Sequence, residues 1–364
     1  MNRIVEWGGK RGEYFWGIRG FLEGGGTGYW RRAFGGWDIM ETWKDTRKAH
    51  EEGGNEMSMN ICGAPCCWGV DDVKNPYLPA WETVLKEAGL AGYRAVELGP
   101  YGYLPVDVER VSGELAKNGL AVVAGTIFDD LLSEENYENV LRQTEEICVL
   151  VTKLPPLPVH EGQHFAAPYL TVMDWGHEER DYAAGHPDRA PRLDERQWGI
   201  MMEHIRGICE RAKAFGVRPV IHPHAGGYIE FADEIEALVR DIPYEMAGLC
   251  LDTGPLYYSG MDPVKWLGKY AKRLDYVHFK DVNEKVYRDV LKKRIRFFEG
   301  CQEGTMCPIG KGCLDYPGIK GILEEIGYSG YITIEQERDP RNSDTSLRDV
   351  KESVSYLKSV GYEI

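Results

Sequence analysis

The chain has 364 residues, of which 43% are hydrophobic, and a formal net charge of −15 at pH 7. This length fits two or three ordinary domains, or one α/β barrel of about 250 residues with insertions. The acidic balance argues against nucleic acid as a partner and favours small neutral ligands or metal cations. The sequence contains no run of 18 apolar residues and no signal-peptide pattern, so we expect no membrane span and a cytoplasmic location.

Residues 1–58 differ in composition from the rest of the chain. They are rich in Gly, Trp and Arg and follow no sustained helical or strand period. We expect an irregular N-terminal extension there and a single catalytic domain over residues 59–364. A second hypothesis is a misassigned start, because residues 51–54 can be encoded by a purine-rich run resembling a bacterial ribosome-binding site. The protein would then begin at Met57 or Met59.

From residue 60 onward, short apolar runs alternate with longer helical patterns. The predicted strands cover residues 61–64, 94–98, 120–124, 169–172, 218–221, 246–251, 274–277 and 331–335. The predicted helices cover residues 80–88, 108–118, 134–150, 196–215, 263–270, 284–297, 317–326 and 346–360. Residues 176–192 and 301–313 are interpreted as loops. This alternation predicts a (β/α)8 TIM barrel; an open doubly wound sheet is the alternative, but no G-x-G-x-x-G follows the first strand.

Four consecutive predicted strands end on a side chain that can bind a metal. These side chains are His222, Asp252, His278 and Glu335. In a parallel barrel the carboxyl ends of the strands share one face, so we expect the four groups to lie close together. Each of them alone could be an ordinary strand-end residue. Together their nitrogen and oxygen donors predict a site for a divalent cation such as Mn²⁺, Co²⁺, Zn²⁺ or Mg²⁺.

Other polar and aromatic residues are candidates for acid–base chemistry or substrate contact. Side chains alternate along a strand, which places His224, Lys280 and Glu337 on the same face as the metal ligands that precede them by two residues. The candidate substrate contacts are Glu97, Asp174 and His177 at strand ends, with Trp68 and Tyr257 as part of an apolar wall. Packing in the core is an equally good interpretation of the two aromatic residues.

The chain from about residue 60 resembles the xylose-isomerase-like sugar isomerase/epimerase superfamily, and within it the inosose (2-keto-myo-inositol) dehydratases. The motifs that carry the resemblance are residues 91–97, 222–224 with Gly226, 251–254, 259–263, 277–281, 310–312, 335–337 and 339–340. The resemblance implies a TIM barrel, a small sugar or cyclitol substrate, and removal of water through an enediolate. Mn²⁺ or Co²⁺ is the favoured ion. Two positions depart from the family pattern: Pro255 stands where His is usual, and Asp174 where many relatives have Glu.

The mechanism predicted from these residues begins with proton abstraction beside a carbonyl polarised by the metal. His224 is the predicted base, because histidine as a residue type titrates near neutral pH. Lys280 or Glu337 is the predicted acid, or holds a substrate hydroxyl. The alternatives are a ketose isomerase or epimerase, a carbon–glycoside lyase, and an inactive barrel that binds a carbohydrate or a partner protein. The sequence also leaves a homo-oligomer open.

Overall fold

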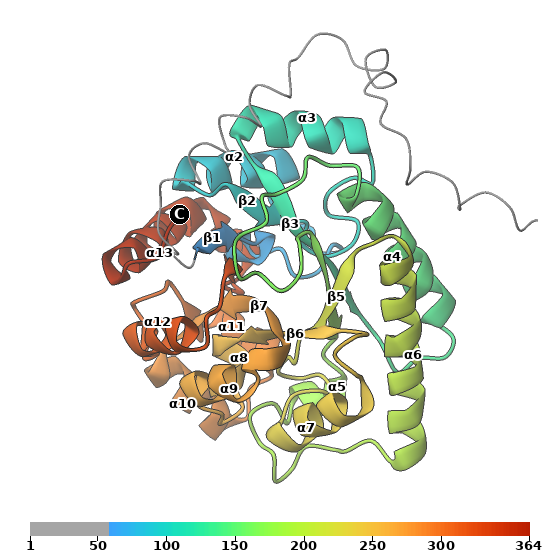
Figure 1. Cartoon of the computed structure of the whole chain (residues 1–364). Helices are drawn as coiled ribbons and strands as arrows, with labels where there is room; N and C mark the ends of the chain where they lie inside the picture. Colours follow the sequence, from blue (N-terminus) through green and yellow to red (C-terminus); the bar gives the residue numbers. More distant parts are fainter. Residues whose placement is uncertain (1–57) are drawn as a thin grey trace, which may run out of the picture. The chain divides into compact units, whose positions relative to one another are not determined.

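A closed barrel of eight parallel strands forms the centre of the protein (Figure 1). The computed structural model describes residues 58–364, so the predictions for residues 1–57 lie outside the described residues. The strands are β1 (Met59–Gly63), β2 (Ala95–Glu97), β3 (Ala121–Asp129), β4 (Tyr169–Asp174), β5 (Arg218–Ile221), β6 (Gly248–Asp252), β7 (Leu274–Phe279) and β10 (Gly330–Ile334). They follow one another around the barrel in chain order, and β10 pairs with β1. This closure confirms the predicted (β/α)8 barrel and excludes the alternative, an open doubly wound sheet.

Helices cover the outside of the barrel. The longer ones are α2 (Trp81–Ala91), α3 (Val108–Asn118), α4 (Tyr137–Val151), α6 (Glu195–Ala214), α7 (Ala232–Asp241), α9 (Pro263–Lys269), α12 (Tyr316–Glu325) and α13 (Ser346–Val360). Their buried residues recur at helical spacing, for example Val84, Leu85 and Ala88 in α2. Of these helices, only α7 was absent from the prediction. Within residues 58–364, no helix is both long and apolar enough to span a membrane.

The structure corrects the predicted end of the helix 80–88. α2 continues to Ala91 and ends at Gly92, whose φ of 103° suits a glycine cap. Gly89 lies where α2 crosses α3. A Cβ atom there would lie 2.6 Å from the carbonyl oxygen of Asn118, so the glycine permits close packing of the two helices.

Short elements follow the carboxyl ends of the strands, where the sequence indicated loops or longer helices. α5 (Glu178–Asp181) lies within the predicted loop 176–192, and α8 (Thr253–Tyr258) begins directly after β6. The predicted helix 284–297 is two helices, α10 (Glu284–Lys293) and α11 (Phe297–Gln302), because Arg294 adopts a left-handed conformation with φ 59°. In the predicted loop 301–313, β9 (Met306–Cys307) pairs with β8 (Asp281–Val282).

The barrel interior is layered. Its deeper layer is apolar and includes Ala95, Val220, Cys250 and Tyr276 on β2, β5, β6 and β7. Because strand side chains alternate, the residue two positions later points to the same interior. Those residues are Glu97, His222, Asp252 and His278, and all four are buried. The change from apolar to polar along each strand therefore places a polar layer at the carboxyl end of the barrel.

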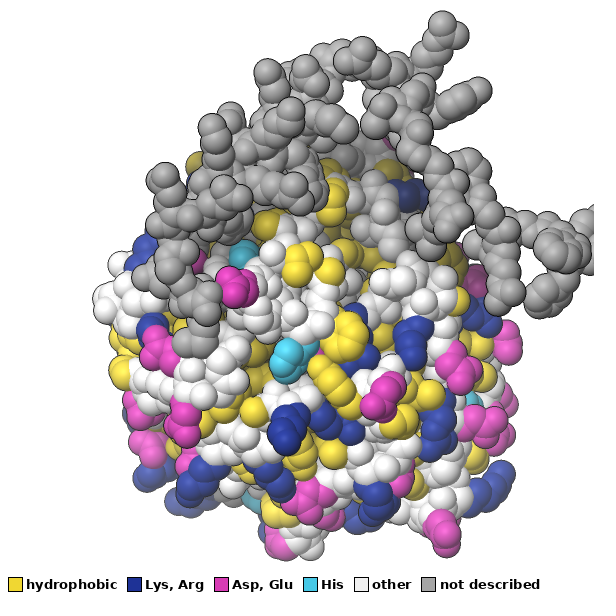
Figure 2. All heavy atoms as spheres, viewed as in Figure 1, with side chains coloured by type: hydrophobic (Ala, Val, Ile, Leu, Met, Phe, Trp, Pro, Cys, Tyr) yellow, Lys and Arg dark blue, Asp and Glu magenta, His cyan; other side chains and the backbone are white. Residues whose placement is uncertain are grey.

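The surface carries charges of both signs. On the face shown in Figure 2, the side chains of Lys and Arg are interspersed with those of Asp and Glu over the described residues. The excess of 58 acidic over 43 basic side chains in the whole chain thus coexists with a mixed surface on this face.

Candidate active site and metal centre

Four side chains that can bind a metal converge at the carboxyl end of the barrel. One donor atom from each of His222, Asp252, His278 and Glu335 lies within 4.8 Å of the others. Asp252 and His278 are register partners on β6 and β7. His222 and Glu335 each stand one residue past their strand, and their amides donate to Val172 O and Phe279 O across 2.9 Å. The backbone hydrogen bonds between strands therefore continue one residue past β5 and β10, and they hold both residues over the barrel axis.

The unpaired polar atoms in this cluster show whether its residues fit a cation. Both ring nitrogens of His222 and Nδ1 of His278 are buried without a hydrogen-bond partner. Leaving such a group unsatisfied costs roughly 1–3 kcal/mol each. A divalent cation with nitrogen and oxygen ligands would satisfy these atoms together. The donor set therefore fits a divalent metal.

The charges around the cluster also favour a cation. Lys280 is fully buried, with its ammonium 3.0 Å from Asp252 Oδ2 and 3.0 Å from Glu335 Oε2, and it also contacts Glu337. Burial alone would lower the pKa of Lys280, but Asp252, Glu337 and Glu335 outweigh it and raise the pKa well above the usual value. Three carboxyl groups therefore face one ammonium, and a divalent cation would bring the cluster closer to neutrality.

Glu97 fixes the orientation of His278. The Nε2 atom of His278 lies 2.9 Å from Glu97 Oε1, and Tyr276 donates its hydroxyl to the same oxygen across 2.7 Å. A carboxylate partner requires the proton on Nε2, so Nδ1 is the nitrogen left to bind a metal, and it faces Glu335 Oε2 at 3.4 Å. Histidine ligands are commonly held by a carboxylate in this way. Glu97 was predicted as a substrate contact; it lines the pocket, but its hydrogen bonds are with the barrel.

His224 is held through its Nδ1. This nitrogen lies 2.9 Å from the carbonyl oxygen of Ala225 and donates to it, so Nε2 is the nitrogen that can exchange a proton with a substrate. Nε2 lies 3.5 Å from Glu337 Oε1. The ring of Phe298 stacks against His224 at a centroid distance of 6.0 Å. A basic nitrogen thus lies between an apolar wall and a carboxylate.

A pocket joins these groups. Its polar lining includes His278 and Glu335 from the metal cluster, and His224 and Glu337 beside it. Phe128 and Phe298 form part of the apolar lining. A concave site with an apolar wall and few converging polar groups is typical of small-molecule binding.

Asp71 is a pocket residue that the sequence analysis missed. It lies shortly after the 3-10 helix η1 (Pro65–Trp68) and lines the pocket with Glu337. Burial, followed by the charge of Glu337, raises the pKa of Asp71 well above its usual value. Asp71 follows no strand end and stands beside Asp72 in a polar stretch, so the sequence offered no signal to distinguish it from a surface residue.

The structure does not bring Trp68 and Tyr257, two of the predicted substrate contacts, to the pocket. Trp68 lies in η1, is buried in the core between barrel and helices, and donates its indole N–H to Glu87 Oε2 across 2.6 Å. Tyr257 is half-buried in α8 and packs on Tyr287 at a centroid distance of 5.5 Å. Packing, the alternative interpretation of both residues, accounts for their positions.

Asp174 and His177 also lie outside the pocket lining and connect loops instead. The backbone amides of Tyr228 and Leu131 donate to Asp174 across 2.7 and 3.3 Å, and His177 Nε2 lies 3.1 Å from either carboxylate oxygen. Asp174 therefore links the loops that follow β3, β4 and β5. The structure brings together the seven predicted metal-binding and acid–base residues with Glu97, and separates these two from them.

Comparisons with known proteins agree with this architecture. A family model described as the xylose isomerase-like TIM barrel matches residues 85–360. An inosose dehydratase of Clostridium beijerinckii is 29% identical over 287 residues, covering 78% of this chain and 91% of that protein. The rhizopine catabolism protein MocC of Rhizobium meliloti is 30% identical over 290 residues, covering 79% and 84%.

Solved structures with the same fold have lower sequence identity. The probable 3-DHS dehydratase AsbF of Bacillus anthracis superposes with a TM-score of 0.60 at 13% identity, over 82% of this chain and 99% of that one. The IOLI protein with a bound zinc atom gives the same TM-score and identity, over 83% and 98%. These likenesses concern the fold. On the match over residues 85–360 and the 30% identity to MocC, the chain belongs to the xylose isomerase-like TIM barrel family.

Proposed function

We propose that this barrel binds a divalent cation through His222, Asp252, His278 and Glu335 and removes water from a small keto-polyol. Family membership and the relatives named inosose dehydratase make the chain an enzyme of the lyase or isomerase type. One observation carries the proposal: His278 and Glu335 of the four-residue donor cluster line the same pocket as the pair His224 and Glu337. An inosose, a cyclic polyol with one ketone, is the proposed substrate class. Mn²⁺ or Co²⁺ is the proposed ion.

Different residues would remove the substrate proton and deliver a proton to the leaving group. A bound divalent cation would polarise the substrate carbonyl and stabilise negative charge on its oxygen. His224 Nε2 would take the proton from the carbon beside the carbonyl, because Nδ1 is already committed to the carbonyl of Ala225. The electrons of the C–H bond form a C=C bond to the next carbon, whose C–O bond breaks. The departing hydroxyl takes a proton and leaves as water.

Two groups can supply that proton. The raised pKa of Lys280 keeps its ammonium charged, so Lys280 can hold a substrate hydroxyl or donate to it. Glu337 contacts Lys280 and lies 3.5 Å from His224, which makes it a path by which the abstracted proton could reach the acid. Asp71 adds a carboxyl group in the same pocket for a substrate hydroxyl. Phe128 and Phe298 would exclude water from one side of the reaction.

A deuterium experiment tests this function. Metal-reconstituted protein is incubated with a panel of keto-inositols and keto-sugars in deuterated water and followed by mass spectrometry. We expect an inosose to lose one water and the product to carry deuterium. Deuterium uptake without loss of water would identify an isomerase or epimerase, and no exchange with any ketone would favour an inactive binding barrel. Asp252→Asn should abolish the reaction, whereas Glu109→Gln on the outer helix α3 should not.

A further inference from the structure

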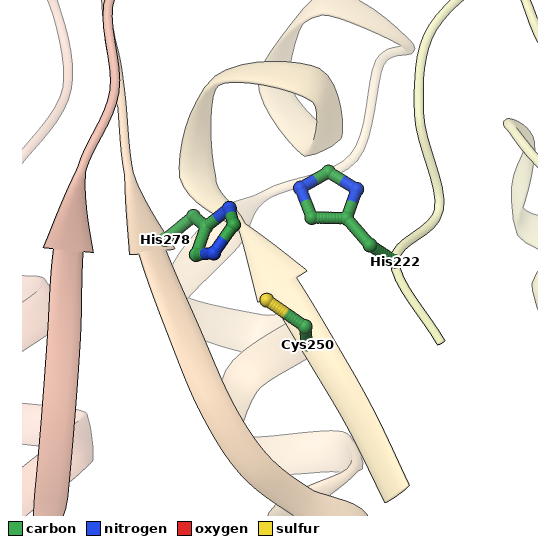
Figure 3. A group of neighbouring side chains, drawn as sticks. All are labelled: His222, Cys250 and His278. Atoms are coloured by element: carbon green, nitrogen blue, oxygen red, sulfur yellow. The ribbon is translucent and has the colours of Figure 1, made fainter. Parts of the chain in front are cut away.

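A thiol lies directly beneath the proposed metal centre. Cys250 is on β6, two residues before Asp252, so both side chains point into the barrel and Cys250 lies one layer deeper. One donor atom each of His222, Cys250 and His278 lies within 4.8 Å of the others. Figure 3 shows Cys250 below the two imidazoles, which come from neighbouring parts of the barrel wall. All three side chains are buried.

The imidazoles have nitrogens available for a ligand on either side. Both ring nitrogens of His222 and Nδ1 of His278 lack a hydrogen-bond partner, although each is buried. The other nitrogen of His278 is held by Glu97 at 2.9 Å. The two donor groups share His222 and His278, so a cation held beside the thiol would compete for both imidazoles with one held by the carboxylates.

Geometry and chemistry limit which cations the lower position accepts. Zinc bonds of about 2.0–2.1 Å to nitrogen and 2.3 Å to sulfur place the donors of a tetrahedral site about 3.4–3.6 Å apart. The donors now lie within 4.8 Å of one another, so a cation would have to draw them closer together. Thiolate is a soft ligand, whereas Mg²⁺ and Mn²⁺ prefer oxygen. The lower position would therefore select a cation that bonds strongly to sulfur.

We propose that His222, Cys250 and His278 form an alternative site for a thiophilic divalent cation such as Zn²⁺ or Cd²⁺. The metal–sulfur bond replaces the S–H bond, and the proton leaves to the buffer. This proposal rests on the proposed metal centre for its two histidines. It gives the protein two donor sets, one with carboxylates and one with a thiolate, that compete for His278. Occupancy of the lower set would therefore displace Mn²⁺ from the upper set.

The test uses the full chain, freed of metal with a chelator and titrated with Cd²⁺. A cadmium–thiolate bond gives a charge-transfer absorption in the ultraviolet that a carboxylate bond does not give. We expect this band in the unmodified protein and its loss in Cys250→Ser, with Cd²⁺ affinity lowered at least about tenfold because the soft ligand is gone. Cys62→Ser is the matched control, since Cys62 is equally buried in the same inner layer and belongs to neither donor set.

A second variant separates this proposal from the proposed function. Asp252→Asn should lose Mn²⁺ binding but keep the cadmium–thiolate band, because the lower set does not use Asp252. This variant also serves if Cys250→Ser does not fold. Cd²⁺ binding without a thiolate band, or a band that survives in Cys250→Ser, would overturn the alternative site. Unchanged Mn²⁺ binding in the same samples would leave the proposed function standing.

Discussion

Glu97 and His278 are joined by a hydrogen bond of 2.9 Å that spans the barrel interior between β2 and β7. Because the bond occupies Nε2, it leaves Nδ1 facing Glu335 at 3.4 Å. The neighbouring Cys250, Glu335 and Glu97 outweigh the effect of burial and raise the pKa of His278 well above its usual value. Surroundings that attract a proton to this ring also attract a metal cation.

The first prediction concerns this hydrogen bond. Glu97→Gln should lower Mn²⁺ affinity by about 10- to 100-fold, because the histidine loses the carboxylate that orients it and increases its basicity. Isothermal titration calorimetry measures the change. Tyr276→Phe is the control, since it removes the other strong hydrogen bond to Glu97 but leaves the bond to His278 intact. Equal affinities of Glu97→Gln and the unmodified protein would mean that Glu97 does not position His278.

The second prediction separates the base from the metal ligands. His224→Gln should lower kcat by about 10²- to 10⁴-fold, the usual contribution of a general base. Its Mn²⁺ affinity should not change, because His224 is outside the four-residue donor cluster. Steady-state kinetics and metal titration of the same sample check both statements. If the variant exchanges the substrate proton at the unmodified rate, the base is another residue.

The third prediction concerns the buried ammonium. Lys280→Met should destabilise the metal-free protein by about 3–5 kcal/mol, since three buried carboxylates lose their partner. Added Mn²⁺ should restore much of this loss and should bind at least as tightly as before, because no ammonium opposes it. Urea unfolding with and without Mn²⁺ measures both effects. A metal-free variant as stable as the unmodified protein would show that Lys280 does not compensate these charges.

Lys280 is one of seven polar residues at the site that the sequence could predict. Side chains alternate along a strand, which identifies those that point into the barrel. The carboxyl ends of parallel strands share one face of the barrel, which places these side chains close together. Glu97 was found at a strand end, but its role depends on His278, 181 positions away. No local pattern contains that partner.

The residues that the sequence missed lie in loops, where the path of the chain decides the position of a side chain. Asp71 enters the pocket because η1 turns the chain after β1, and Phe298 enters because α10 ends at Arg294 and α11 begins at Phe297. Trp68 and Tyr257 lie outside the pocket lining for the same reason. Residues of η1 and α8 follow strands directly, yet helical turns direct these two side chains into packing contacts.

The fourth prediction concerns pH and the pair His177 and Asp174. Burial alone would lower the pKa of His177, but Asp174 outweighs it and raises the pKa. A raised histidine pKa stabilises the fold fully below the unfolded pKa of about 6.5, and this contribution is lost as pH rises through the folded pKa. Burial also raises the pKa of Asp174, which acts in the same direction at lower pH.

His177→Gln should therefore cost more stability at about pH 5.5 than at about pH 9, with a cost of roughly 1–3 kcal/mol at the lower pH for the lost charged hydrogen bond. Urea unfolding at the two pH values gives the difference. In an Asp174→Asn background the same substitution should show little dependence on pH. A cost that grows with pH would contradict the assigned ion pair.

The most direct test of the metal centre is anomalous X-ray diffraction from crystals grown with Mn²⁺. We predict one anomalous peak within bonding distance of His222, Asp252, His278 and Glu335, at the head of the pocket that holds His224. The peak should be absent from crystals of Asp252→Asn grown in the same way. A protein that crystallises with Mn²⁺ but gives no peak at these four residues, or a peak bound by other side chains, would contradict the account.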